Sequence, residues 1–307
     1  MTVLETIQKS GDFLSKKGVD SPRLQAELLL AHVLKLPRMK LYLNFERSLS
    51  EPETDAMREF VKRRGQREPL QHIVGSTSFC GFEIAVNRHV LVPRPETELL
   101  TEAGWEFLNH LSAGVVPRRP VSSGEEDGAS QSSALREEEL SALDFGTGSG
   151  CIAIALAAKC PESKILALDV SEEALAVAKG NAGQNGVGER IDFLCGDGFA
   201  ALASDVRFNL IISNPPYIPS EEIATLQPEV RDFDPRNALD GGSDGLDFYR
   251  MLACRAASFL KPGGKIMVEF GDGQAGAIQK ILTEQKWIVE GVRDDYSQRQ
   301  RILIARI

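Results

Sequence analysis

Asp144-Phe145-Gly146-Thr147-Gly148-Ser149-Gly150 joins an apolar run at residues 140–144, which predicts a buried strand, to an apolar helix predicted at 150–159. Glycines permit the tight turn and let the backbone pass close to a ligand. A further apolar run, 164–168, predicts the next strand, and Asp169 follows it directly. A carboxylate at this place is typical of ribose binding, while the alternative is a helix N-cap. The stretch therefore predicts a Rossmann-like unit that binds a nucleotide cofactor.

The remainder of the C-terminal half alternates between strand and helix signals, which indicates a parallel sheet covered by helices on both faces. Only residues 293–299 separate the last two predicted strands, too few for a crossover helix, so these strands must pair antiparallel. The predicted fold is α/β, with a seven-stranded sheet whose last strand is antiparallel. The predicted strands are 140–144, 164–168, 191–194, 207–213, 264–270, 287–292 and 300–306, and the predicted helices include 150–159, 172–184, 246–259 and 274–285.

The glycine spacing is GxGxG and not the GxGxxG of dinucleotide-binding proteins. Together with the antiparallel ending, this spacing favours S-adenosylmethionine over NAD as the cofactor. Gly196-Asp197-Gly198-Phe199 follows the third predicted strand at the same edge of the sheet. Asp197 could accept a hydrogen bond from an adenine amino group, and Phe199 could stack on the adenine ring. The alternative is an ordinary turn whose phenylalanine packs inward.

Asn214-Pro215-Pro216-Tyr217 follows the apolar run 208–213, so it lies past the carboxyl end of a predicted strand, where ligands bind in open α/β sheets. The Asn214 side-chain oxygen and the Pro215 carbonyl are acceptors, and the prolines remove backbone donors and stiffen the loop. Tyr217 adds a flat aromatic face. A stiff loop with two acceptors and a ring is suited to a planar –NH2 group. The alternative is a proline-rich turn that only closes the strand.

Composition bounds the classes of function. The 307 residues carry a net charge of -9, with 42% hydrophobic and 26% charged residues, which is ordinary for a globular protein. Residues 141–307 hold 17 basic and 23 acidic side chains, which disfavours duplex nucleic acid as the main partner. No apolar run approaches the ~20 residues of a membrane span, and the first residues show no signal or transit pattern. Five scattered cysteines predict reduced thiols in a cytoplasmic protein, and the four histidines lack metal-ligand spacing, so we expect no metal.

The N-terminal part has a different character. Residues 1–75 predict a small helical domain, in which Ser21-Pro22 would cap and start one helix. Residues 76–92 change to the pattern of a β-hairpin, which we expect to link this domain to a catalytic domain at 93–307. Residues 112–139 are rich in Gly, Ser and Glu and predict a flexible insertion.

The motifs in combination resemble one family. The Asp144–Gly150 turn, Asp169, the Gly196–Phe199 turn and the Asn214–Tyr217 loop together resemble class I S-adenosylmethionine-dependent methyltransferases that act on planar amino nitrogens; adenine-N6 methyltransferases share the last loop. The wider pattern is similar to the HemK/PrmC family of protein-(glutamine-N5) methyltransferases, which modify peptide chain release factors. The wider motifs are Pro22-Arg-Leu-Gln-Ala-Glu-Leu-Leu-Leu30, Glu68-Pro-Leu-Gln-His-Ile-Val-Gly75, Val92-Pro-Arg-Pro-Glu-Thr-Glu98 and Ala238-Leu-Asp-Gly-Gly-Ser-Asp-Gly-Leu246.

The resemblance implies roles for the residues. Gly146 to Gly150 would line the methionine part of S-adenosylmethionine, Asp169 would bind the ribose, and Phe199 would stand where the family has an aromatic at the adenine. Asn214 and Pro215 would accept from a substrate amide, with Pro216 in the same substrate loop and Tyr217 against the amide face.

The implied substrate is the glutamine of the Gly-Gly-Gln motif in class 1 peptide chain release factors, methylated on the side-chain nitrogen by in-line displacement. Because the methyl group of the cofactor is already activated, no general base and no catalytic His or Cys is expected. The N-terminal helical domain would recognise the release factor; the alternative is a helical cap that only stabilises the enzyme. The working expectation is a monomer without membrane or direct nucleic-acid contacts.

Overall fold

The computed structural model describes residues 1–114 and 140–307 of the chain. The chain forms two compact units, which we call the helical unit and the sheet unit. The helical unit comprises Met1–Thr77, Val86–Arg88 and Ala224–Asp234, and the sheet unit comprises Ser78–Ala85, His89–Ile223 and Pro235–Ile307. A short segment from the C-terminal half of the sequence therefore belongs to the helical unit.

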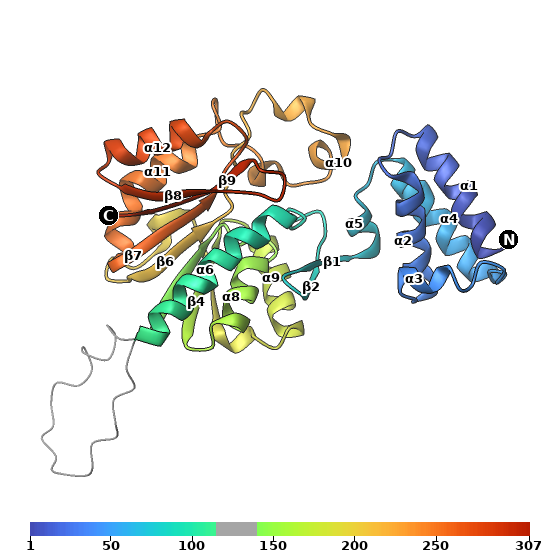
Figure 1. The fold of residues 1–307 in the computed structure, drawn as a ribbon, viewed down its shortest axis with the longest axis horizontal. Helices are drawn as coiled ribbons and strands as arrows, with labels where there is room; N and C mark the ends of the chain where they lie inside the picture. Colours follow the sequence, from blue (N-terminus) through green and yellow to red (C-terminus); the bar gives the residue numbers. More distant parts are fainter. Residues whose placement is uncertain (115–139) are drawn as a thin grey trace, which may run out of the picture. The chain divides into compact units, whose positions relative to one another are not determined.

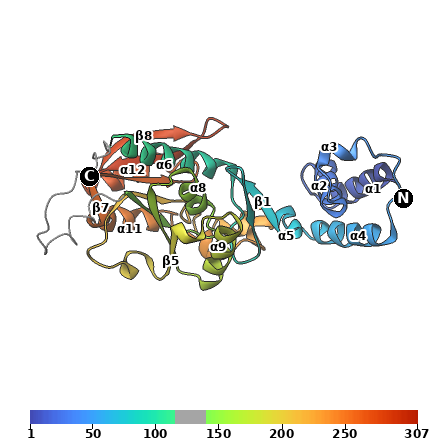
Figure 2. The same ribbon diagram turned by 90° about the horizontal axis from the view of Figure 1, so that it is seen from below.

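The helical unit is built on helices α1, α2 and α4, which pack against one another around a small apolar core (Figures 1 and 2). Its helices are α1 (Val3–Lys16), α2 (Pro22–Leu34), α3 (Arg38–Leu41), α4 (Glu51–Gly65) and α5 (Leu70–Val74), with the short α10 (Pro228–Arg231) from the later segment. Capping boxes begin α1 and α4. The hydroxyls of Thr2 and Ser50 accept from the backbone N–H groups of Glu5 and Glu53, and the carboxylates of these glutamates accept from the backbone N–H groups of the two cap residues.

Ser21 differs from its predicted role. Helix α2 begins at Pro22, but Ser21 has a left-handed backbone with φ of +47° and its side chain makes no capping hydrogen bond. The rigid ring of Pro22 starts the helix without it, because the missing N–H of a proline at the first helical position needs no partner.

The sheet unit holds seven strands in the order β5-β4-β3-β6-β7-β9-β8. All neighbouring pairs are parallel except those of β9, which is antiparallel to both β7 and β8. The seven-stranded sheet and its antiparallel last strand are confirmed. The strands are β3 (Leu140–Phe145), β4 (Ser163–Asp169), β5 (Ile191–Cys195), β6 (Phe208–Ser213), β7 (Leu260–Glu269), β8 (Ile288–Asp294) and β9 (Gln300–Arg306).

Strand order reverses at β3. From β3 the chain moves outward through β4 to β5, then returns to the other side of β3 as β6 and continues to β7. Right-handed crossovers in opposite directions place their helices on opposite faces of a sheet. Helices α6, α8 and α9 accordingly cover one face and α11 and α12 the other (Figure 1). These helices are α6 (Pro95–Gly114), α8 (Cys151–Lys159), α9 (Glu172–Gln184), α11 (Asp247–Arg255) and α12 (Ala275–Glu284).

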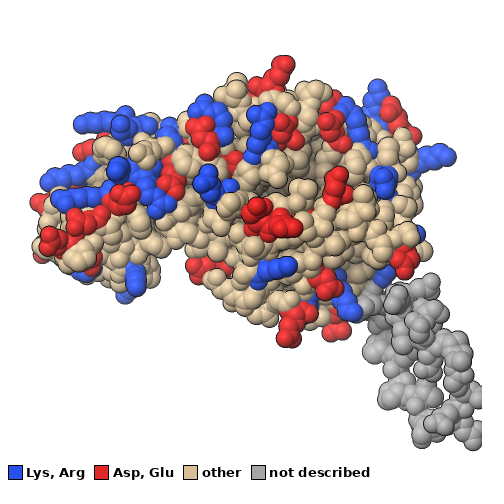
Figure 3. Space-filling model, turned by 180° about the vertical axis from the view of Figure 1, so that it is seen from behind, with Lys and Arg blue, Asp and Glu red and all other residues tan. Residues whose placement is uncertain are grey.

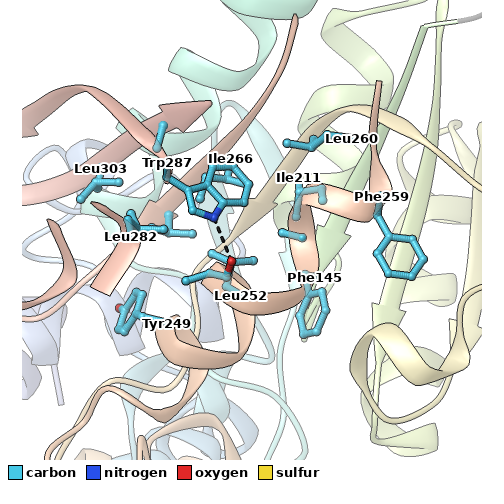
Figure 4. Packing of buried hydrophobic residues seen from close by; sticks show 14 of the residues in the cluster. Phe145, Ile211, Tyr249, Leu252, Phe259, Leu260, Ile266, Leu282, Trp287 and Leu303 are labelled. Carbon is cyan, nitrogen blue, oxygen red and sulfur yellow. Dashed lines mark hydrogen bonds between the residues drawn. The ribbon is translucent and has the colours of Figure 1, made fainter. Parts of the chain in front are cut away.

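The core between the sheet and α11 and α12 is aromatic and aliphatic (Figure 4). Trp287 begins the chain segment that leads into β8 and is almost fully buried. Its indole nitrogen donates to the carbonyl of Ala253 on α11 at 2.9 Å, which satisfies the one polar atom that this ring brings into the core. The contact ties the C-terminal hairpin to α11.

Several boundaries differ from those predicted. Helix α6 continues to Gly114, so residues 112–114 are helical, and the other residues of the predicted 112–139 insertion lie outside the described residues. The helix predicted at 246–259 is α-helical only to Arg255 and then tightens into a 3-10 turn.

Strands β1 (Ser76–Phe79) and β2 (Phe82–Ala85) pair as a two-stranded sheet. Within the described ranges, no helix is both long and apolar enough to cross a membrane.

Candidate active site

A cavity of about 320 Å³ lies in the sheet unit at the carboxyl ends of β3, β4 and β6, where the strand order reverses. Several residues singled out in the sequence line it: Gly146, Thr147, Gly148, Ser149, Asp169, Asp197, Asn214, Pro215 and Pro216. Gly150, Phe199 and Tyr217 are not among its lining residues. Most of the predicted positions, far apart in the chain, therefore meet at one place.

The glycine turn leaves open space above its backbone. Gly146 and Gly148 have φ of +75° and +54°, values that side-chain-bearing residues rarely adopt. A Cβ atom added at either position would meet nothing within 4 Å. The N–H groups of Gly146 and Thr147 donate to the carbonyl of Leu168 on β4 at 2.8 and 2.9 Å, which pins the turn to the neighbouring strand. The turn is a rigid floor on which an elongated ligand could lie.

Asp144 lies beneath this turn, completely buried. Its Oδ2 accepts from the Thr147 hydroxyl at 2.6 Å and from the backbone N–H of Ala153 at 3.1 Å. Its Oδ1 is buried and has no hydrogen-bond partner among the residues that the structure describes. Burial raises the pKa of Asp144 to about 7. A negative charge held under the cavity floor favours a cationic ligand, which the charge of S-adenosylmethionine fits.

Asp169 ends β4 with its carboxylate in a fixed position. Oδ2 accepts from the N–H of Gly148 at 2.8 Å, and Oδ1 accepts from the N–H of Ser171 at 3.0 Å. Each carboxylate oxygen has a second lone pair, so both can still accept from hydroxyl groups in the cavity. Helix α9 is capped by the Ser171 hydroxyl, which accepts from Ala174 N at 3.1 Å, so the N-cap alternative for Asp169 does not apply.

Asn214 follows β6 directly and lies next to the end of β7. Its side-chain Nδ2 donates to the hydroxyl of Thr97, in the first turn of α6, at 3.0 Å. The Thr97 hydroxyl in turn donates to Oε2 of Glu269, the last residue of β7, at 2.7 Å. Thr97 and Glu269 are each only 2% exposed. Burial raises the pKa of Glu269 to about 7.

Tyr217, predicted to lie against the face of the substrate amide, is not among the residues that line the cavity, and it packs behind the loop against the apolar core of the sheet unit. Burial raises the pKa of its hydroxyl to about 12. Its carbonyl accepts from the side-chain amide of Gln274 at 2.9 Å. Gly245, with φ of +75°, presses so closely on this backbone that an added Cβ would lie 2.3 Å from the Tyr217 carbonyl oxygen. The glycines of the Ala238–Leu246 motif thus allow a second loop to support the Asn214–Tyr217 loop.

Phe199 does not reach the cavity, contrary to the prediction of a ring that stacks on a ligand. It is 3% exposed and packs between Phe145 and Phe259, with ring centroids 4.9 and 5.0 Å away. The reason is local: Gly198, at φ of +55°, leads into a tight 3-10 turn that directs Phe199 inward. The inward-packing alternative describes this residue.

The aromatic side chains that do line the cavity are Phe145 and Phe248, whose rings meet edge to face at 5.1 Å. Met251, three residues after Phe248 on α11, lines it too. Sequence reasoning missed both α11 residues, because a helix with apolar side chains at this spacing is read as core. It also missed Asp144, Thr97 and Glu269, whose buried contacts give no local signal. Within residues 1–114 and 140–307, no cluster of three or more His, Cys, Asp or Glu could hold a metal ion.

Comparison with known proteins agrees with this fold. Residues 122–227 match the family model described as Methyltransferase small domain, and residues 5–75 match the PrmC N-terminal domain. Among solved structures, the hMettl16 catalytic domain in complex with a MAT2A 3'UTR hairpin has a TM-score of 0.50 at 14% identity, covering 83% of this chain and 81% of that one. The fold and the site define a class I methyltransferase, an enzyme whose cofactor is S-adenosylmethionine.

Relatives narrow the class further. The chain is 41% identical over 277 residues to the release factor glutamine methyltransferase of Geobacter sulfurreducens, covering 90% of this chain and 87% of the relative. It is 40% identical over 303 residues to that of Chlorobaculum tepidum, covering 98% and 95%. The chain belongs to the family of release factor glutamine methyltransferases, which confirms the predicted family resemblance and the predicted cofactor.

Proposed function

We propose that this enzyme transfers a methyl group from S-adenosylmethionine to the side-chain amide nitrogen of the glutamine in the Gly-Gly-Gln motif of class 1 peptide chain release factors. One observation carries the proposal: Asn214 and Pro215 line the same cavity as the glycine turn and Asp169. Asn214 and Pro215 would thus form an acceptor pair for an –NH2 group beside the turn that would hold the cofactor. The relatives named release factor glutamine methyltransferase supply the identity of the amide.

The chain's residues would bind the cofactor at three places. The Gly146–Gly150 turn would carry the methionine part, with the Asp144 charge below it. Asp169 would accept from the ribose hydroxyls, since two backbone N–H groups already hold its carboxylate in place. Asp197, exposed on the cavity wall, would accept from the adenine amino group. Phe248 offers the aromatic face that Phe199 does not.

The substrate loop would act by orientation. An amide nitrogen is a poor nucleophile, but S-adenosylmethionine, when bound, would supply a methyl group that its sulfonium has already activated. The N–CH3 bond would form as the S–CH3 bond breaks, S-adenosylhomocysteine would leave, and the methylated nitrogen would lose a proton to water. The Asn214 oxygen and the Pro215 carbonyl would hold the two hydrogens of the substrate –NH2 and favour the positive charge that grows on the nitrogen. Holding the nitrogen in line can contribute on the order of 7–11 kcal/mol. Pro216 keeps the loop stiff, and Tyr217 supports it from behind through Gln274.

The helical unit is the part that we propose recognises the release factor. It carries the match to the PrmC N-terminal domain, and it exposes large apolar side chains that a protein substrate could cover. The most exposed are Met39 (66%) and Leu43 (77%), on and after α3. We propose that the enzyme acts as a monomer in the cytoplasm, where the free thiols of its five cysteines would stay reduced.

A protein substrate also fits the surface charge better than a nucleic acid does. On the face that Figure 3 shows, acidic and basic side chains lie beside one another over the sheet unit, without the broad basic area that phosphate binding requires.

The direct test is incubation of the enzyme with purified release factor and methyl-labelled S-adenosylmethionine, beside a release factor with Gln→Ala in the Gly-Gly-Gln motif. We expect label on the first protein alone. Equal labelling of the two would exclude the proposed target. Labelling of an adenine-containing RNA or DNA in place of the release factor would favour the adenine-N6 alternative.

Asn214→Ala tests the role of the loop. Loss of the acceptor should lower kcat by about 10²–10³-fold, as for removal of one preorganised hydrogen-bonding group. The Kd of the cofactor, measured by titration calorimetry, should change by less than about threefold, because the glycine turn and Asp169 are untouched. A variant that loses cofactor binding but keeps turnover at saturating cofactor would contradict the acceptor role.

A further inference from the structure

Two strand ends bring Asn214 and Glu269 together. Strands β6 and β7 are parallel, and Ser213 is in register with Val268, so the next residue of each strand lies at the same level. Thr97 reaches between them from the start of α6, and its hydroxyl is in hydrogen-bond contact with both side chains. Fixed backbone elements therefore hold all three groups.

The hydroxyl of Thr97 has one proton, and this restricts the arrangement. An ionised carboxylate can only accept hydrogen bonds, so the Thr97 hydroxyl must donate its one proton to Oε2 of Glu269. Only lone pairs then face Asn214, and only the NH2 end of the Asn214 amide can meet them. The oxygen of Asn214 is thereby turned away from Thr97. A protonated Glu269 could itself donate to Thr97, whose proton would then be free to meet the Asn214 oxygen.

We propose that Thr97 and Glu269 together control the orientation of the Asn214 amide, an arrangement that we call the polarity relay. Ionised Glu269, acting through the Thr97 hydroxyl, orients the Asn214 amide with its oxygen toward the substrate nitrogen. Protonation of Glu269 removes this constraint and lets the amide turn. Both are positioning residues, because they act on the substrate through Asn214. The inference rests on the proposed role of Asn214 as an acceptor. It adds to that role a cause for the amide's orientation and a dependence on pH.

The surroundings of Glu269 shift the pKa of its carboxyl toward neutral pH. Its pKa is raised to about 7, mainly by burial and further by the charge of Glu96, against the lowering effect of the Thr97 hydrogen bond and of the nearby arginines. The charged or titratable groups that face it from the neighbouring elements are Arg94, Glu96, Tyr217, Tyr249 and Arg301. The hydroxyl of Tyr249 donates to the Glu269 main-chain carbonyl at 2.7 Å, so its proton is already used. Thr97 is the side-chain partner of the carboxylate.

The kinetic test compares four proteins: wild type, Glu269→Gln, Thr97→Val and Thr97→Ser. kcat for release factor is measured at saturating cofactor between pH 5.5 and 8.5. We expect wild-type kcat to fall at acid pH as Glu269 takes up a proton. Glu269→Gln should lose this acid limb, since its amide oxygen accepts from Thr97 at every pH. Thr97→Val should lower kcat at least tenfold at all pH values, and Thr97→Ser should restore most of it.

Cofactor affinity separates the relay from general damage to the site. The Kd of S-adenosylmethionine should stay within about threefold of wild type in Thr97→Val and Glu269→Gln at pH 8. Glu269→Gln with the full wild-type acid limb, or Thr97→Val with wild-type kcat, would overturn the relay.

A second measurement needs no substrate. In protein labelled with ¹⁵N-asparagine, the Asn214 side-chain NH2 signal, assigned by its loss in Asn214→Ala, should shift with pH in wild type and Thr97→Ser. It should not shift in Glu269→Gln. If wild-type enzyme leaves the release factor unlabelled, the proposed substrate is wrong. The pH titration of the Asn214 signal then still tests the relay, because it needs no substrate. The relay is refuted if the Asn214 signal does not shift with pH in wild type, or if it shifts equally in Glu269→Gln.

Discussion

Asp144→Asn should make the cofactor-free enzyme more stable at pH 8 and a poorer binder of S-adenosylmethionine. Burial raises the pKa of Asp144 from 3.8 to about 7. Between these pH values the folded chain keeps a proton that the unfolded chain has lost, so the free energy of unfolding falls as pH rises. A shift of about 3 units corresponds to roughly 4 kcal/mol of lost stability once the pH exceeds the folded-state pKa.

Asparagine would remove the cost of ionising a buried carboxyl group but add the cost of a buried NH2 group without a partner. Its oxygen can still accept from Thr147 and Ala153, as Oδ2 of Asp144 does. Its NH2 group would take the place of Oδ1, which has no partner among the described residues, and a buried unpaired donor costs about 1–3 kcal/mol. The net gain at pH 8 is therefore about 1–3 kcal/mol. At pH 4 the asparagine variant should instead be less stable by about 1–3 kcal/mol, because wild-type Asp144 is then protonated in the folded chain and only the cost of the unpaired NH2 group remains.

Urea denaturation at pH 5, 6.5 and 8, without cofactor, measures the stability of both proteins, and calorimetry at pH 8 measures cofactor affinity. We expect the difference in unfolding free energy to grow with pH, and the Kd of S-adenosylmethionine to rise at least tenfold, since a single lost charge interaction of about 1.4 kcal/mol already has that effect. An asparagine variant less stable than wild type at pH 8, or equally affected at all three pH values, would refute this reasoning. Unchanged cofactor affinity would separate Asp144 from the cofactor.

Two further variants test the support of the loop and the anchoring of the later segment. Gly245→Ala should lower kcat at least tenfold with little change in cofactor Kd, because its Cβ would displace the Tyr217 carbonyl; Gly263→Ala, at φ of +76° with nothing within 4 Å, is the control for backbone strain alone. In the helical unit, burial raises the pKa of Glu229, but hydrogen bonds from Arg67 and Arg64 outweigh it and hold the pKa below its usual range. Glu229→Gln should cost about 2 kcal/mol in urea denaturation, because it leaves the buried guanidinium of Arg64 without its carboxylate, whereas Asp232→Asn, in an exposed pair, should leave stability nearly unchanged. Wild-type stability in Glu229→Gln, or equal effects in the two glycine variants, would contradict these expectations.

The sequence allowed the sheet to be predicted well because its signals are local. Each strand is an apolar run, and the short 293–299 connection allowed only an antiparallel last pair. The position of β9 between β7 and β8 had no such signal. Ala224–Asp234 was likewise read as part of the catalytic domain, yet it packs in the helical unit, where Glu229 meets Arg64 and Arg67. Such contacts join residues far apart in the chain, so the local spacing of residues in the sequence does not predict them.

The cavity could be predicted at the level of strand ends but not of side-chain direction. Asp169 and Asn214 follow strands directly, and the carboxyl ends of parallel strands share one edge, so their meeting was expected. Phe199 follows a strand by the same logic but turns inward, because Gly198 adopts φ of +55° and starts a 3-10 turn. A glycine in the sequence does not reveal which of its many conformations it will take.

Two buried carboxylates lie at the carboxyl ends of strands in the same sheet, Asp144 as the next-to-last residue of β3 and Glu269 as the last residue of β7. Both have a pKa raised to about 7. Each therefore lowers the stability of the empty fold at neutral pH, since the ionised form is disfavoured inside the protein. An apolar or amide side chain would fill either place at less cost, so their retention is not explained by folding. Both lie where their charge acts on the cavity: Asp144 under the glycine turn, and Glu269 through Thr97 on Asn214. The two carboxylates that destabilise the fold are therefore the ones that would position the cofactor and the Asn214 amide. Destabilising side chains are expected at an active site, where function and not stability determines the residue.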